Sequence, residues 1–159
     1  MGKASASIAV AFGLLAAAAA PAIAQRRQPP PRAPVLVGID ALRADFRISS
    51  GTDTVFFGGS SATLGAPAKR VLQAQAMWLR RHPQVVVSIE GHADASDTRD
   101  HALAVGARRA QEVRDYLILF GVPPTQMTAT SWGKERLTVG GNNEAAFAAN
   151  RRVQTVLVR

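Results

Sequence analysis

The sequence predicts an α+β domain in which helices lie on one side of a mixed, four-stranded sheet. Residues Val85–Ile89 form a largely β-branched run, which is typical of a buried central strand. Two segments, Ala68–Leu79 and Leu103–Phe120, carry apolar residues at helical spacing. Shorter apolar runs predict three further strands, at Val55–Phe57, Met127–Ser131 and Val153–Val158.

The segments between these elements have the composition of loops. Gly58–Ala62 reads Gly-Gly-Ser-Ser-Ala, and Gly91–Asp100 is rich in polar residues. The helix that follows Pro67 ends at His82, because proline at the next position does not continue a helix.

The second helix is the clearest element of the chain. Its stripe consists of Leu103, Gly106, Ala110, Val113, Leu117 and Phe120, and Gly121 with Pro123 and Pro124 ends it. Asn142–Asn150 predicts a short further helix, so the order is β-α-β-α-β-(α)-β, and no internal repeat is visible.

Residues 1–24 have the pattern of a secretory signal peptide. Lys3 precedes an apolar run over Ile8–Ala20, and Ala22 with Ala24 makes the small-x-small pattern of a cleavage site. The alternative is a retained membrane anchor, but the run is short and rich in alanine, whereas a spanning helix needs about 20 strongly apolar residues. We expect export to the periplasm and a mature chain that begins at Gln25.

The next segment, residues 25–44, is expected to be a basic, proline-rich tether and linker. It begins Gln-Arg-Arg-Gln-Pro-Pro-Pro, a composition that cannot build a core. Short apolar groups between Val35 and Ile48 suggest extended structure. The folded domain is expected over residues 45–159.

Charge and cysteine content exclude several classes of function. The formal net charge is +8, and +7 without Lys3. Anionic lipid, nucleic acid and an acidic cell wall are all partners for such a chain, but export disfavours nucleic acid, and no aromatic residues alternate with the basic ones as stacking would require. The chain has no cysteine, which excludes disulfides, thiol catalysis and a lipid anchor on cysteine.

The most informative charged residues are Asp94 and Arg109. Asp94 follows the buried strand, and Arg109 lies beside the apolar stripe of the second helix. A carboxylate and a guanidinium in one concave spot suit a zwitterion, since Asp94 can accept an ammonium and Arg109 can clamp a carboxylate. The alternative is that the two side chains pair only with each other.

Several motifs together resemble the OmpA C-terminal-like domain family, most nearly its peptidoglycan-associated lipoprotein branch. They are Gly91-His92-Ala93-Asp94, Gly106-Ala107-Arg108-Arg109-Ala110, Asp115-Tyr116-Leu117, Gly121-Val122-Pro123, Trp78 to Pro83, Gly133-Lys134-Glu135 and Asn150-Arg151-Arg152. The resemblance covers about residues 45–159 in one register.

The resemblance implies non-covalent, non-catalytic binding of peptidoglycan through the diaminopimelate of its peptide stem, without a cofactor or metal. In the family, the residues at Asp94 and Arg109 hold the diaminopimelate. The other implied ligand-binding residues are Phe57, Gly58, Gly59, Ser60, Thr98, Val105, Asn150 and Arg151. Asn150 and Arg151 would close the far end of the pocket, and the alternative for these two residues is a purely structural role. Peptidoglycan is the expected partner, with Tol-Pal-type envelope proteins or outer-membrane proteins as further candidates.

Three positions depart from the family pattern. Ala102 replaces the usual Asn, Asp97 the usual Gly, and Ser60 the usual Asp or Asn. Asp97 adds a negative charge beside the expected pocket, and Ala102 removes a polar group that would brace the loop. The departures favour an alternative, in which the pocket is degenerate and the chain is an envelope protein–protein interaction module.

Other sites are weaker hypotheses. His92, Asp94 and His101 are competent zinc ligands, but nothing in their spacing fixes a tetrahedral geometry. Ser60 and Ser61 lack a nucleophile elbow. Trp78 is expected in the core, and Trp132 either in the core or at the rim of the pocket.

Overall fold

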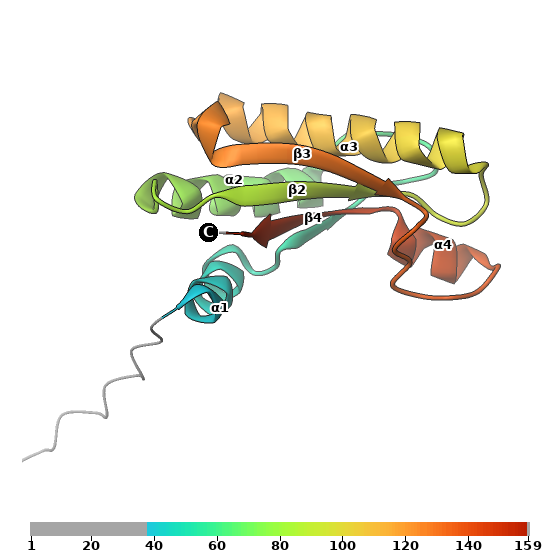
Figure 1. Ribbon diagram of the computed structural model, residues 1–159, viewed down its shortest axis with the longest axis horizontal. Helices are drawn as coiled ribbons and strands as arrows, with labels where there is room; N and C mark the ends of the chain where they lie inside the picture. Colours follow the sequence, from blue (N-terminus) through green and yellow to red (C-terminus); the bar gives the residue numbers. More distant parts are fainter. Residues whose placement is uncertain (1–37, 159) are drawn as a thin grey trace, which may run out of the picture. The chain divides into compact units, whose positions relative to one another are not determined.

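The computed structural model describes residues 38–158, and within them a four-stranded mixed sheet with helices packed against it (Figure 1). The elements are α1 (Ile39–Ser50), β1 (Thr54–Phe56), α2 (Ala66–Arg81), β2 (Val87–His92), α3 (Arg99–Leu119), the 3-10 turn η1 (Pro124–Gln126), β3 (Met127–Gly133), α4 (Glu144–Asn150) and β4 (Arg152–Leu157). No helix of this part of the chain is long and apolar enough to cross a membrane.

The sheet has the strand order β1-β4-β2-β3, so the two central strands are β4 and β2. β2 runs parallel to β3 and antiparallel to β4, and β1 is an antiparallel edge strand. The predicted α+β class and mixed sheet are therefore confirmed. β2 begins at Val87 and continues to His92, so Gly91 and His92 belong to a strand and not to the loop that the sequence predicted.

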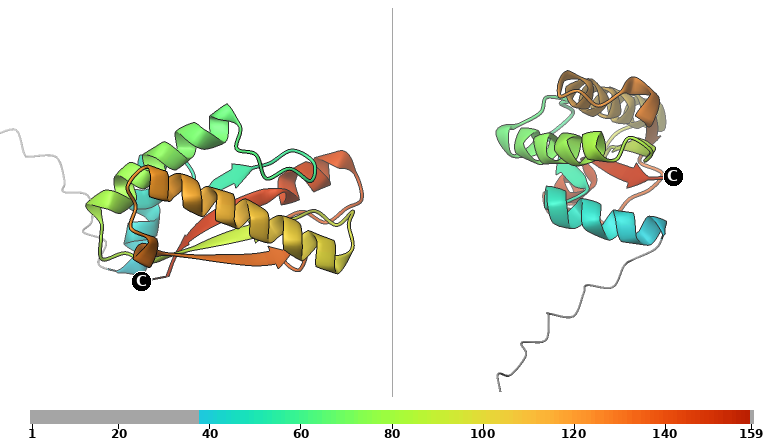
Figure 2. Two further views of the ribbon diagram at one scale, coloured as in Figure 1. Left: turned by 90° about the horizontal axis from the view of Figure 1, so that it is seen from above. Right: turned by 90° about the vertical axis from the view of Figure 1, so that its left-hand side faces the viewer.

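α2 and α3 lie over the same face of the sheet (Figure 2). The buried apolar residues between these helices and the strands form the core, which includes Leu72, Trp78, Leu79, Val87, Ile89, Val113 and Leu117. α3 approaches β2 very closely at two glycines: a Cβ on Gly91 would lie 1.9 Å from the carbonyl oxygen of Gly106. The absence of both side chains therefore sets how α3 sits on the strands that carry the site.

The expectation of extended structure between Val35 and Ile48 is wrong for the residues that the structure describes, because α1 occupies Ile39–Ser50. Its apolar residues Leu42 and Phe46 lie four apart, which is the spacing of one helical face. Phe46 is buried edge-on against Trp78 of α2, with ring centroids 5.1 Å apart, and Trp78 Nε1 donates a 2.6 Å hydrogen bond to Asp45. These long-range partners are not visible from local sequence.

The expected linker boundary at residue 44 falls inside α1. The expected signal peptide and the tether up to residue 37 lie outside the described residues.

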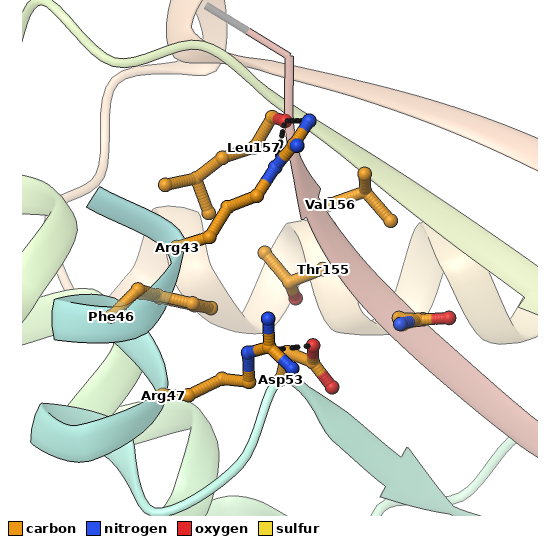
Figure 3. Close-up of a pocket in the computed structure, with 8 residues that line it drawn as sticks. Arg43, Phe46, Arg47, Asp53, Thr155, Val156 and Leu157 are labelled. Atoms are coloured by element: carbon orange, nitrogen blue, oxygen red, sulfur yellow. Dashed lines mark hydrogen bonds and ion pairs between the residues drawn. The ribbon is translucent and has the colours of Figure 1, made fainter. Parts of the chain in front are cut away.

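α1 also covers a gap at the sheet edge (Figure 3). Among residues 38–158, β1 pairs only with Arg152–Gln154, and no described strand flanks the C-terminal half of β4 on that side. There Arg43 donates from Nε and Nη2 to the carbonyl oxygen of Leu157, at 3.3 and 2.9 Å. A cavity of about 170 Å³ remains between α1 and β4. The helix thus takes the place of a longer edge strand.

Candidate functional site

Four chain segments meet at the end of the sheet opposite to α1. They are the C-terminal end of β2, the N-terminal half of α3, the loop after β1 and the junction of α4 with β4. Hydrogen bonds donated by Arg109 and Arg151 connect them, with Asp94 accepting from Arg151, and these three side chains are all largely buried.

Asp94 follows β2 directly and accepts hydrogen bonds on both carboxylate oxygens. Oδ1 accepts from the backbone N–H of Ser96 at 2.9 Å and from its hydroxyl at 2.5 Å. Oδ2 accepts from Nε of Arg151 at 2.5 Å. Burial raises the pKa of Asp94, but the bonds from Ser96 and Arg151 outweigh burial, so the pKa lies below its ordinary value. Asp94 is therefore a charged acceptor at neutral pH.

Arg109 lies beneath the surface, with 1% of its area exposed. It donates to three backbone carbonyls: Nε to Ser61 and Nη1 to His92, both at 2.9 Å, and Nη2 to Gly59. Burial lowers the pKa of Arg109 to about 10, which keeps the guanidinium charged at neutral pH. Since a guanidinium has five N–H donors, two take no part in these three hydrogen bonds.

The two charged side chains singled out in the sequence do not form an ion pair with each other. Asp94 pairs with Arg151, and Arg109 fastens the loop after β1 to the end of β2. The simple alternative of an Asp94–Arg109 pair is therefore wrong in this structure. The two groups remain close enough for the charge of Asp94 to act on Arg109.

Arg151 bridges two carboxylates. Besides Asp94, it donates from Nη1 to Glu144 of α4 at 2.8 Å, and the hydrogen bond to Asp94 raises the pKa of Arg151. Asn150, expected to close the pocket, is instead buried with its amide used internally: it bonds to backbone groups of Thr138, Val139 and Ala146. Asn150 holds the loop before α4.

The loop after β1 contributes backbone carbonyls that accept hydrogen bonds from Arg109 within the chain. Gly58 accepts a turn hydrogen bond from the backbone N–H of Ser61 at 3.1 Å, and Gly59 adopts a φ of +47°, which favours glycine. Ser60 is exposed. Phe57 is buried, and its ring centroid lies 5.3 Å from the guanidinium carbon of Arg109.

The remaining expected residues lie on or before α3. Thr98 caps the helix by accepting from the backbone N–H of His101 at 3.4 Å. Val105 is buried in a small cluster with Ala93 and Ala102, so the position of Ala102 is apolar here. The Asp97 carboxylate is partly exposed and lies 3.6 Å from His101 Nε2.

Two contributors to the site were missed from sequence. Ser96 braces Asp94 in a local turn, and the spacing Asp-x-Ser is a signal that could have found it. Glu144 reaches Arg151 from α4, and no local signal shows this pairing. Within residues 38–158 no group of three His, Cys, Asp or Glu side chains could hold a metal ion. Trp132 of β3 stacks with Arg136, whose guanidinium carbon lies 3.4 Å from the centroid of the indole ring.

Comparison with known proteins identifies the fold and the family. The model of the OmpA family matches residues 56–151. The peptidoglycan-associated lipoprotein of Agrobacterium fabrum is 42% identical over 113 residues, which cover 71% of this chain and 63% of that protein. This chain therefore matches less than two thirds of the length of that relative.

Solved structures agree with this result. The peptidoglycan-associated lipoprotein from Burkholderia pseudomallei superposes with a TM-score of 0.66 at 37% identity, over 68% of this chain and 92% of that one. The C-terminal domain of Helicobacter pylori MotB, at 20% identity and a TM-score of 0.63 over 67% of this chain and 84% of that one, shares the fold. The chain belongs to the OmpA family, whose domains are structural and not enzymatic.

Proposed function

We propose that this protein binds peptidoglycan non-covalently in the periplasm, and that it supports the integrity of the cell envelope without catalysis. The proposal rests on the family and on relatives that are named for their association with peptidoglycan. In this proposal, residues 1–24 direct export and are then removed. Tol-Pal-type envelope proteins or outer-membrane proteins are the candidate protein partners.

We further propose that the ligand group is the zwitterionic end of diaminopimelate. The observation that supports this is the charged Asp94 carboxylate, which pairs with Arg151 and whose charge also acts on Arg109. Asp94 would accept the ammonium of the ligand, and the free N–H groups of Arg109 or Arg151 would donate to its carboxylate. Gly58, Gly59 and Ser60 would present backbone groups, and Val105 with Phe57 would form the apolar wall.

Binding has a cost in this arrangement. Arg151 already donates to Asp94 Oδ2, so a ligand ammonium must either share this oxygen with Arg151 or displace the arginine from it. Glu144 can hold the displaced guanidinium, because it already accepts from Arg151. Hydrogen bonds to charged groups contribute about 1.5–3 kcal/mol each, so we expect affinities in the micromolar to millimolar range.

A sedimentation assay with diaminopimelate-type peptidoglycan tests the proposal. The wild type should sediment with the wall at low and moderate salt, whereas Asp94→Asn, which keeps the shape of the side chain, should reduce the bound fraction at least tenfold. Asp115→Asn, on the exposed side of α3, is the matched control and should bind like the wild type. Equal binding by all three proteins, or loss of wild-type binding at moderate salt, would contradict the proposal.

A second candidate function is an envelope interaction module with a degenerate pocket. The specific observation in its favour is that Asp94 and Arg109 are already hydrogen-bonded within the chain. In that case a partner would be captured equally well by the wild type and by Asp94→Asn, and neither protein would sediment with the wall.

A further inference from the structure

A second group of polar side chains lies on the sheet face turned away from α2 and α3. Val153 belongs to the core beneath these helices, so the residue before it, Arg152, faces the other way. His92 lies close enough to Arg152 and Arg136 for their charges to act on it. The pairing of Gly91 with Val153 places Arg152 beside His92, and Arg152 in turn pairs with Phe56 of β1. The row crosses three strands near one end of the sheet.

Arg152 is a buried cation that forms no ion pair with a carboxylate of residues 38–158. Only 8% of its area is exposed, its Nη2 donates to the backbone carbonyl of Arg136 at 3.1 Å, and its Nη1 has no hydrogen-bond partner among the described residues. The nearby Glu90 lies 3.9 Å from Arg136 instead. Burial lowers the pKa of Arg152, and the negative charge of Glu90 opposes this effect without forming an ion pair with Arg152.

Arg152 lines a groove of about 370 Å³. Its other walls include Thr54, Phe56, Thr138 and Gln154, which offer hydroxyl and amide groups but no carboxylate. The ring of Phe56 is 57% exposed, which is unusual for a phenylalanine and leaves an apolar surface next to the cation. The groove therefore combines one buried positive charge, neutral polar groups and one apolar wall.

We propose that this groove binds the carboxylate terminus of a short apolar peptide. The carboxylate would pair with the guanidinium of Arg152, and the adjoining apolar side chain would cover Phe56. To present Nη1, the guanidinium must turn toward the groove and give up its bond to Arg136, so the affinity should be millimolar. The site is distinct from the proposed wall site, because Arg151 points to Asp94 and Arg152 does not.

The test is a titration of the full chain followed by amide chemical shifts in ¹H–¹⁵N spectra. The probes are N-acetyl-alanyl-alanine, the same dipeptide with an amidated C-terminus, and sodium acetate, all at constant ionic strength. The free acid should shift the Phe56, Thr138 and Gln154 amides saturably. Its affinity should exceed that of the amide and of acetate at least tenfold. Equal shifts with the amide would overturn the role of the carboxylate, and equal affinity for acetate would overturn the role of the peptide.

Variants locate the binding. Arg152→Gln should lower the affinity for the free acid at least tenfold. Arg81→Gln, which removes the same charge from the exposed end of α2, should leave that affinity unchanged. Phe56→Ala leaves Arg152 in place and should weaken binding several-fold, which keeps the test valid if Arg152→Gln does not fold. Asp94→Asn should leave the affinity of the groove for the free acid unchanged. Shifts centred on Asp94, or binding that survives both groove variants, would contradict the proposal independently of the wall assay.

Discussion

Arg109 has a structural role in addition to its proposed role in ligand binding. Its guanidinium joins the loop after β1 to the end of β2 through three carbonyls that lie 17 to 50 residues away in the chain. Gln75 has a similar role: it interrupts an apolar stripe, yet it is fully buried, donates to Thr52 O at 3.0 Å and accepts from Thr155 at 2.9 Å. Polar residues that look anomalous in the sequence thus connect distant elements.

His92 predicts a pH dependence of stability. It is 2% exposed, and burial, with Arg152 and Arg136 nearby, lowers its pKa from 6.5 to about 4. The unfolded chain therefore binds a proton that the folded chain does not between these values, so stability is full above pH 6.5 and falls as the pH drops toward 4. At pH 4.5 the free energy of unfolding should be lower by roughly 2–3 kcal/mol than at pH 7.5.

Urea unfolding at the two pH values measures this loss. His92→Phe removes the titrating group and keeps a ring, and it should unfold with a much smaller difference between pH 7.5 and 4.5. An undiminished difference in the variant would assign the pH dependence to other groups. The lower limit of pH 4.5 keeps the measurement above the range in which Asp94, with its lowered pKa, takes up a proton.

At the scale of elements, the contact of β2 with α3 depends on two glycines. A Cβ on Gly106 would lie 2.4 Å from the Ser131 hydroxyl and 2.9 Å from the carbonyl oxygen of Gly91. Both are closer than real contacts allow, and the Gly91 carbonyl is backbone that cannot turn away. α3 would have to move off the sheet, and with it Arg109.

Gly91→Ala should therefore lower the free energy of unfolding by about 3 kcal/mol, the upper part of the range for overpacking. The measurement is denaturant unfolding at neutral pH. Gly140→Ala is the matched control, since no heavy atom lies within 4 Å of a Cβ at that position. If the two variants are equally stable, α3 can shift at no cost and the close packing does not position the site.

At the scale of the folded unit, the contacts of α1 and the proposed wall site lie at opposite ends of the sheet. α1 packs at the Leu157 end of β4, and Arg151 lies at the other end, about 20 Å away for six residues of strand. Gln75 and the core residues lie between these two ends of the sheet. Changes in α1 should therefore alter stability without altering the proposed wall site.

Phe46→Ala should cost about 3 kcal/mol, because it removes a buried ring that packs against Trp78. Under conditions where the variant remains folded, its binding to peptidoglycan should equal that of the wild type in the sedimentation assay. Ile48→Ala, on the same helix but 82% exposed, is the control and should change neither property. Loss of wall binding in folded Phe46→Ala would contradict the separation of the two ends.

The α+β class, the two long helices, the four strands and the family could all be predicted from the sequence. These follow from local periodicity and from motifs such as Gly91-His92-Ala93-Asp94, which are readable in short windows. The sequence also predicted Asp94 and Arg109 as the central charged pair of the site. α1 was missed because its apolar spacing is short and its partners, Trp78 and Leu157, lie far along the chain.

Only the tertiary structure decided which charges meet. Asp94 pairs with Arg151 rather than with Arg109, Asn150 is used internally, and Arg152 is left buried without an ion pair to a carboxylate of residues 38–158. Residues 94 and 151 are separated by 57 positions, and their contact depends on the strand order that places β4 beside β2. Local pattern reports which face of an element is apolar, whereas the pairing of polar side chains depends on how the elements are packed together, and that is set by the whole core.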